Sequence, residues 1–492
     1  MPSPHEGILD ILREDLPTKK TLSWLRVLRS IFSFASWPEK SDKPLRPTAY
    51  LDGLRGFAAF LVYWHHHELF AHAATTEALF ARFENAWGWK GFFHFVTFPW
   101  VRNFFSGGHI AVAVFYVISG YVLSVKPLSL IHNGEHLKVA DNLGSAFFRR
   151  WFRLFIPIIV TTFVFMTSWH VFDIWLSTNV KQPTYGAELW KWYVEFKNFS
   201  FLFKENQPWM EVNRHLWSIG LEMRGSVIVY MALLALMRAT TKARLLCQVA
   251  LIYYFIYIVD GYYGALFMAG MLQADLDLLA KRNDGEFPQW LRRLERYKTF
   301  IVYHLFFIGL WLAGVPALTT KVENLRENPG WQWAEYLKPQ AVFDYKWFYL
   351  FWASNMIVAS VPRIPWVKRF FETRFCQYLG RISYALYLVH GPIINTLGDR
   401  LYFAVGWIRP LEYDQKMLAA WMNKFPLPRT GPLGLEVSFL VPHIILLPFT
   451  LWMADLVTRG VDEPSVRIAQ WLYRKTLGGG PQEKSEPAMR LA

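Results

Sequence analysis

The chain has 492 residues, of which 53% are hydrophobic, with 24 Trp, 23 Tyr and 41 Phe. This composition is too apolar and too aromatic for an ordinary soluble domain. The formal net charge of +14 would suit a nucleic-acid partner, but the basic residues fall between apolar segments rather than in one patch, so we expect no nucleic acid to be bound. The two cysteines have no zinc-type spacing and imply no disulfide framework.

Residues 1–49 are polar and basic and form a predicted cytosolic tail. Within this tail, Arg26 and Arg29 interrupt the apolar segment 21–37, which indicates a helix lying on the membrane surface. A disordered tail is the alternative interpretation.

Apolar segments then follow along the chain, many of them near the 20 residues that a membrane-spanning helix needs. They predict an all-α, polytopic transmembrane bundle of about ten spans within a domain at 50–465, followed by a partly disordered cytosolic tail at 466–492. The loops before the third, fifth, seventh and ninth segments are each net positive, which places them and both termini in the cytosol. The segments lie near residues 54–72, 108–126, 152–172, 217–237, 245–259, 261–280, 300–319, 342–361, 378–398 and 433–457.

The first apolar segment carries ionisable residues at both ends, which is unusual for a membrane helix. Asp52 and Arg55 stand at its start, and the consecutive histidines His65, His66 and His67 stand near its end. At about 100° per residue, Arg55 and His66 differ by roughly 20° and are separated by about 16 Å of helix rise. Only the middle histidine therefore shares a stripe with the arginine. The alternative is a snorkelling arginine and an interfacial histidine cluster.

Two motifs border the cytosolic loop between the second and third segments. The second segment contains Ser119, Gly120 and Tyr121, whose small residues would also suit a close helix contact. Arg150 and Arg153 lie three residues apart and so share one helical face, as two guanidinium groups must to hold a phosphate. Anchoring of the span by positive charge explains the two arginines equally well.

Further polar residues occur at the fourth and ninth segments. Glu222 lies near the start of the fourth segment, where it would orient a substrate or pair with Arg224 or Arg214. In the ninth segment, three polar residues fall within about 60° on a helix and so form a stripe that must face the bundle interior. They are Ser383, Tyr387 and His390.

These motifs resemble those of the acyltransferase 3 family of membrane acyltransferases. The arginine, ten residues, histidine spacing of Arg55 and His66 is that family's opening motif, and similar patterns cover the chain as far as Pro464. The stretch after Glu222 resembles the fungal branch. The resemblance implies transfer of an acyl group, commonly acetyl, from acyl-CoA to a hydroxyl of a sugar, lipid or small metabolite.

The resemblance also implies roles for the residues. His66 would act as general base, Arg55 would orient the donor, and Asp52 would hold Arg55. The donor channel would be lined by Ser119, Gly120 and Tyr121, and the phosphates of coenzyme A would be bound by Arg150 and Arg153. The acceptor would be contacted by Glu222, Ser383, Tyr387 and His390. We expect acyl-CoA as donor, no permanently bound cofactor and no metal, in the endoplasmic reticulum or another endomembrane.

The main alternative function is a multi-span transporter or proton-coupled binding protein, because intramembrane His, Arg and Glu also mark ion pathways. The sequence shows no inverted repeat and no matched pair of broken spans, which are the usual signs of a transporter. A non-catalytic scaffold would have no use for the stripe from Arg55 to His66.

Overall fold

The structure is a computed structural model that describes residues 45–73, 77–203, 208–282 and 285–477. These residues form helices, turns and loops and include no strand, which confirms the predicted all-α fold. The predicted surface helix at 21–37 and the end of the predicted C-terminal tail lie outside the described residues.

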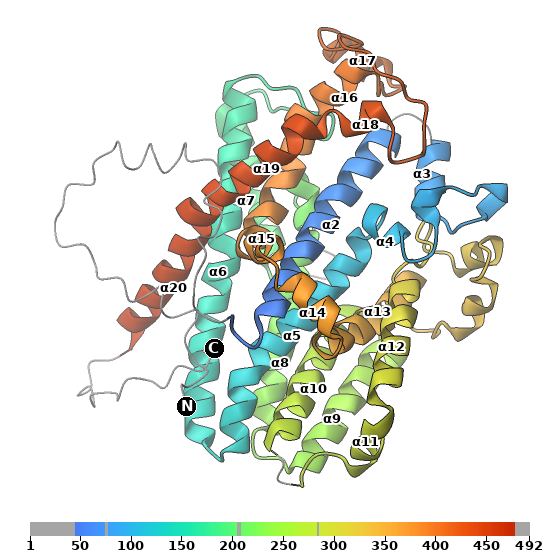
Figure 1. The fold of residues 1–492 in the computed structure, drawn as a ribbon. Coiled ribbons are helices and arrows are strands. Elements are labelled where there is room, and N and C mark those ends of the chain that lie inside the picture. Colours follow the sequence, from blue (N-terminus) through green and yellow to red (C-terminus); the bar gives the residue numbers. More distant parts are fainter. Residues whose placement is uncertain (1–44, 74–76, 204–207, 283–284, 478–492) are drawn as a thin grey trace.

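The longer helices form the body of the molecule, and shorter helices lie in the connections (Figure 1). The longer helices are α2 (Ala49–Ala73), α5 (Gly108–His132), α6 (His136–Val171), α7 (Tyr185–Ser200), α8 (Trp217–Leu236), α9 (Thr241–Tyr253), α10 (Tyr262–Arg282), α12 (Lys298–Leu312), α13 (Tyr345–Ser360), α15 (Arg374–Ile393), α19 (His443–Val457) and α20 (Glu463–Thr476). The shorter helices are α3 (Glu77–Glu84), α4 (Arg102–Phe105), α11 (Gln289–Arg293), α14 (Pro365–Phe371), α16 (Asp399–Val405), α17 (Glu412–Met417) and α18 (Val437–Leu440).

Every predicted apolar segment overlaps one of the longer helices. Among the described residues, 4 helices are long and apolar enough to cross a membrane by length and composition. They are Gly108–His132, His136–Val171, Glu211–Leu236 and Val437–Thr476. The number of ten spans and the cytosolic position of both termini therefore stay predictions. α2 has 25 residues, enough for about 37 Å of helix, but its histidines and charged residues lower its mean hydropathy.

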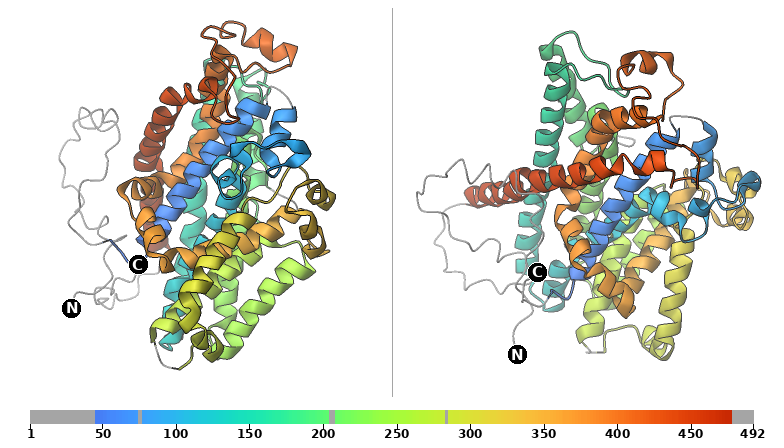
Figure 2. Two further views of the ribbon diagram at one scale, coloured as in Figure 1. Left: turned by 45° about the vertical axis from the view of Figure 1, so that its right-hand side comes forward. Right: turned by 45° about the horizontal axis from the view of Figure 1, so that its top comes forward.

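Helix α2 lies inside the bundle, where it packs against α15 and α5, while α5 packs against α10 (Figure 1). Glycines permit these close contacts. A Cβ atom on Gly56 would lie 2.1 Å from the backbone N of Gly380, and one on Gly120 would lie 2.0 Å from the carbonyl O of Phe267. Helices α19 and α20 form a long arm across the bundle, where α19 packs on α15 and α20 on α6 (Figure 2).

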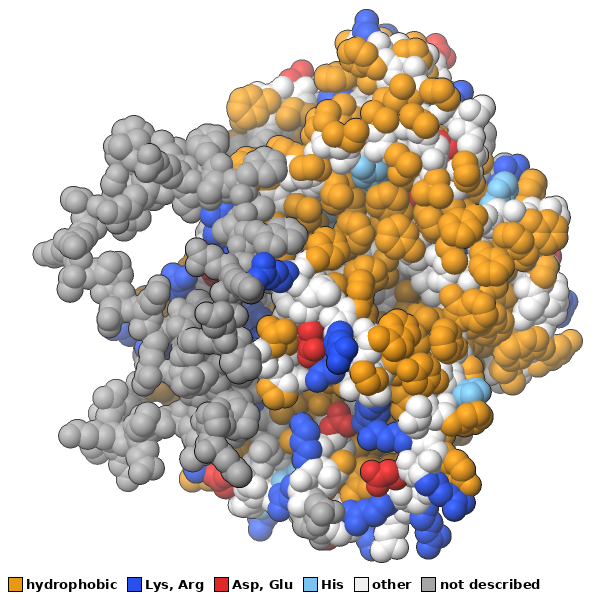
Figure 3. Space-filling model, in the orientation of Figure 1, with side chains coloured by type: hydrophobic (Ala, Val, Ile, Leu, Met, Phe, Trp, Pro, Cys, Tyr) orange, Lys and Arg blue, Asp and Glu red, His pale blue; other side chains and the backbone are white. Residues whose placement is uncertain are grey.

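The surface separates into an apolar part and a basic part. Figure 3 shows broad hydrophobic areas over most of the visible face, with Lys and Arg side chains gathered toward its lower edge. Large apolar side chains are exposed on several helices, among them Met231 on α8, Leu246 on α9, Phe300 on α12 and Ile444 on α19. An exposed apolar surface of this kind is expected for helices that face lipid.

Candidate functional site

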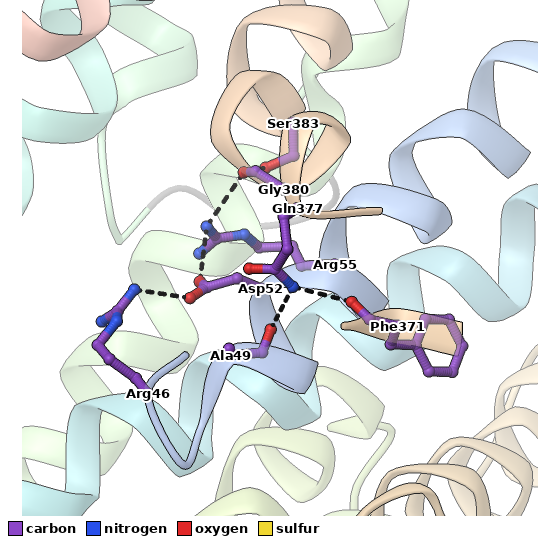
Figure 4. Close-up of polar contacts among 8 residues, drawn as sticks. All are labelled: Arg46, Ala49, Asp52, Arg55, Phe371, Gln377, Gly380 and Ser383. Carbon is purple, nitrogen blue, oxygen red and sulfur yellow. Dashed lines mark hydrogen bonds and ion pairs between the residues drawn. The ribbon is translucent and has the colours of Figure 1, made fainter. Parts of the chain in front are cut away.

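The start of α2 forms a charged cluster with α15 (Figure 4). Arg55 Nη2 donates to Asp52 Oδ1 at 3.2 Å and to the carbonyl O of Gly380 at 3.4 Å. Arg46 Nη2 donates to the other carboxylate oxygen of Asp52 at 3.0 Å, and Ser383 Oγ donates to the same Gly380 carbonyl at 2.9 Å. Asp52 thus fixes the direction in which the Arg55 guanidinium points.

This cluster borders a cavity of about 250 Å³ between α2, α5, α6, α8 and α15. The predicted site residues Arg55, Ser119, Arg150, Arg153, Glu222, Ser383 and Tyr387 are among those that line it. Its other lining residues are mainly apolar, including Phe115, Ile118 and Leu154. The tertiary structure therefore collects polar motif residues from five helices around one cavity of mixed character.

An ion pair between α6 and α8 forms part of the wall of this cavity. Arg150 Nη2 donates to Glu222 Oε1 at 2.7 Å, and Ser119 Oγ donates to the same oxygen at 3.1 Å. Arg150 Nε also donates to Ser226 Oγ at 3.0 Å. The sequence allowed Glu222 either to orient a substrate or to pair with Arg214 or Arg224. In the structure it pairs with Arg150, because packing of α6 on α8 brings that guanidinium to the acid.

Arg153 lies one helical turn from Arg150 and is exposed, and it forms no ion pair within the described part of the chain. Both arginines also line an adjoining cavity of about 230 Å³, to which Lys126 and Arg149 contribute further positive charge. The two cavities share Val122 and Leu123 as well as the arginines. A cavity of mixed character thus adjoins a strongly basic one.

Two of the three residues predicted to line the donor channel do not line the 250 Å³ cavity. Gly120 provides the close contact of α5 with Phe267 of α10, which is the packing role that the sequence also suggested. The hydroxyl of Tyr121 donates to Asp277 Oδ2 at 3.1 Å. Of this motif, Ser119 alone is part of the cavity wall.

The other end of α2 meets two further histidines from different parts of the chain. His66 Nδ1 lies 2.9 Å from His390 Nε2 on α15. The ring centroid of His66 lies 4.2 Å from that of His215, in the short helical segment Glu211–Leu216 before α8, and 5.0 Å from that of His390. We refer to His66, His215 and His390 as the histidine trio. His215 stands in the motif before the fourth segment, but nothing in the sequence assigned it a role.

Hydrogen bonds indicate which ring nitrogens of His66 and His390 carry protons. His390 Nδ1 lies 3.2 Å from the carbonyl O of Leu386, which only accepts, so this nitrogen is the donor. In a neutral imidazole the other nitrogen, Nε2, then accepts a hydrogen bond from Nδ1 of His66. His66 Nε2 is consequently left with a free lone pair, which is what a general base requires.

The trio and the cavity are connected through Tyr387 and Ser218, which line the cavity while His66 does not. Their hydroxyl oxygens lie 2.6 Å apart, and the Tyr387 hydroxyl also lies 2.7 Å from the carbonyl O of His215. The Tyr387 ring centroid is 5.6 Å from that of His390. Tyr387 therefore lies between the cavity and the histidine trio.

The two neighbours of His66 project into other surroundings, as the helical register predicts. His65 lies 5.3 Å from the ring of His109, and His67 Nδ1 lies 2.8 Å from the hydroxyl of Tyr402. His65 also belongs, with Glu84 and His109, to a group whose potential metal-ligating atoms lie within 4.8 Å of one another; the histidine trio forms a second such group. Both have donor atoms that suit a metal ion, so the expected absence of a metal stays a prediction.

Comparison with known proteins identifies the class to which this fold and site belong. Residues 48–452 match the model of the acyltransferase domain of the acyltransferase 3 family, and the chain therefore belongs to this family of acyltransferases. It is 27% identical over 490 residues to O-acetyltransferase PaAT-1 of Phomopsis amygdali, covering 94% of this chain and 91% of that protein.

Two further relatives are also fungal. Acyltransferase clz18 of Cochliobolus lunatus is 22% identical over 494 residues, which cover 89% of this chain and 97% of the relative. Acyltransferase R4 of a Phoma species is 22% identical over 491 residues, which cover 88% and 97% respectively. No solved structure matches the chain.

Proposed function

We propose that this acyltransferase is an acyl-CoA-dependent O-acyltransferase, that its donor is acetyl-CoA, and that His66 is its general base. The observation that carries this proposal is the hydrogen-bonded pair of His66 and His390, which leaves Nε2 of His66 with a free lone pair. The name of the relative O-acetyltransferase PaAT-1 supports transfer of acetyl to oxygen.

In the proposed reaction, His66 Nε2 takes the proton of an acceptor hydroxyl while the oxygen attacks the thioester carbonyl carbon. The carbon–sulfur bond breaks, and the coenzyme A thiolate leaves and takes up a proton. The acceptor is a hydroxyl of a small metabolite, sugar or lipid. A neutral imidazole is suited to this step because histidine has an unperturbed pKa near neutrality.

The basic cavity supports the proposed donor. Lys126, Arg149 and Arg153 line it, and phosphates are held by charge-assisted hydrogen bonds from such side chains. With the nucleotide phosphates of coenzyme A there, its pantetheine arm would extend along the adjoining 250 Å³ cavity toward Tyr387. Arg55, at the wall of that cavity, would orient the donor.

The test is thioester consumption by the purified full chain in detergent. We expect release of free coenzyme A from acetyl-CoA when a cell extract that contains hydroxyl-bearing metabolites is added. This release should be lost in His66→Ala. A chain that binds acetyl-CoA but releases no coenzyme A with any hydroxylated acceptor would contradict the proposed reaction.

A further inference from the structure

A third cavity lies at one end of the bundle, apart from the proposed acyl-transfer site. It has a volume of about 280 Å³ and is formed where the ends of α5, α8 and α10 meet the starts of α6 and α9. It shares no lining residue with the two cavities described above. Its lining includes His132, His136, Arg238, Thr240, Arg244, Arg282 and Glu286.

The inner wall of this cavity is a buried network around Asp275. This carboxylate accepts hydrogen bonds from Arg244 Nε at 2.7 Å, Gln248 Nε2 at 2.8 Å and His132 Nε2 at 2.7 Å. Arg244 Nη2 adds a fourth contact at 3.1 Å. Because Asp275 is fully paired within the wall, it does not neutralise the other basic groups that line the cavity.

Two histidine nitrogens at this wall have no hydrogen-bond partner among the described residues. The side chain of His132 is 4% exposed, and its Nδ1 has no hydrogen-bond partner among the described residues. Nδ1 of His136 is likewise buried without one. Unpartnered buried polar atoms are costly unless a ligand or water satisfies them. These atoms therefore indicate that the cavity holds water or a polar ligand.

The charge of the remaining lining residues indicates that this ligand is an anion. Arg238 is exposed at the rim, and Arg282 is held over the end of α5 by a hydrogen bond from Nη1 to the carbonyl O of His132 at 2.6 Å. Glu286 is the carboxylate among the lining residues, so the arginines outnumber it. The N-terminus of α9, capped by Thr240, also borders the cavity, and a helix N-terminus favours negative charge.

We propose that this cavity binds a phosphate monoester beside the N-terminus of α9. Its oxygens accept hydrogen bonds from Arg238, Arg282 and Nδ1 of His136 at the start of α6. Its hydroxyl donates to Nδ1 of His132 at the end of α5, whose Nε2 donates to Asp275. The phosphate is supplied either by the headgroup of an anionic phospholipid or by a soluble phosphate compound. The site stands at the ends of helices whose sides are apolar and exposed, such as Leu246 and Val249 on α9, and basic pockets in this position suit lipid headgroups. The proposal does not depend on the proposed reaction.

The experiment measures binding to the purified full chain in detergent by the shift of the unfolding midpoint temperature. The probes are a short-chain phosphatidylinositol 4-phosphate, inorganic phosphate, and short-chain phosphatidylcholine at matched ionic strength. We expect the phosphoinositide to raise the midpoint and phosphatidylcholine to leave it unchanged. A shift with the phosphoinositide alone identifies a lipid as the source, and an equal shift with inorganic phosphate identifies the phosphate group itself as sufficient.

Variants separate this cavity from general attraction to a basic surface. Arg238→Gln combined with His136→Gln should weaken phosphoinositide binding by about tenfold or more, since two polar contacts are lost. Ala239→Trp, which fills the cavity without changing its charge, should weaken binding as well. Arg293→Gln removes one positive charge from α11 outside the cavity and should have no effect. Absence of a shift with both phosphate probes, or equal binding by all variants, would overturn the proposal.

Discussion

The two ends of α2 are both polar, but they are built on opposite principles. At the first end, Asp52 lies between Arg46 and Arg55, and the Arg150–Glu222 pair lies across the same cavity, so each of these charges has an opposite partner. At the second end, three imidazole rings lie together with no carboxylate hydrogen-bonded to His66 or His390 in the described chain. The first end is suited to hold charged groups in place, and the second is suited to move a proton.

Substitution of His66 is the strongest test of this difference between the two ends of α2. His66→Ala should lower turnover by a factor of about 10² to 10⁴, because general-base catalysis typically contributes that much. His65→Ala and His67→Ala are matched controls on the same helix and should have much smaller effects. The measurement is turnover per folded molecule at equal expression. Near-normal turnover in His66→Ala with loss in either neighbour would show that the assignment of the base is wrong.

At the charged end of α2, substitutions should affect binding of the donor rather than the chemical step. Arg153→Gln should weaken binding of acetyl-CoA by about tenfold to a hundredfold, the value of one charge-assisted hydrogen bond of about 1.5–3 kcal/mol. The Michaelis constant for acetyl-CoA is the quantity to follow, with turnover at saturating donor as its control. An unchanged Michaelis constant would reduce Arg153 to an anchor for the span.

Arg150 should behave differently from Arg153, because it already pairs with Glu222. Arg150→Gln and Glu222→Gln should each lower the unfolding midpoint, since each leaves one partly buried charge without its partner. The double variant should recover part of the loss, with a coupling energy of about 1–2 kcal/mol. Additive losses in a double-mutant cycle of thermal unfolding would contradict a stabilising pair.

The smallest expected effect is at His390, which we infer positions His66. His390→Ala removes the acceptor for the Nδ1 proton of His66 and should lower turnover about fivefold to tenfold, as expected for loss of about 1 kcal/mol of hydrogen bonding. His390→Gln keeps an acceptor oxygen and should restore part of the activity. If the glutamine and alanine variants are equally impaired, His390 contributes through packing alone.

Features that depend on local helix geometry could be predicted from the sequence. Helical periodicity placed His66, and neither of its neighbours, on the stripe of Arg55, and the structure sends His65 and His67 to other contacts. The same periodicity predicted that Ser383, Tyr387 and His390 face the interior, where all three are buried. The motif spacing also identified the family, which the match over residues 48–452 confirms.

Contacts between side chains on different helices could not be predicted from the sequence, because they depend on the tertiary structure. His215 joins His66 and His390 because the short helical segment before α8 (Glu211–Leu216) packs against α15, which packs against α2. A single histidine before an apolar segment carries no sign of such a contact. Glu222 likewise pairs with Arg150 on α6, which lies 72 residues away in sequence. Local periodicity fixes the direction of a side chain around its own helix, whereas its partners depend on how separate helices pack, and that packing is set by contacts between distant segments.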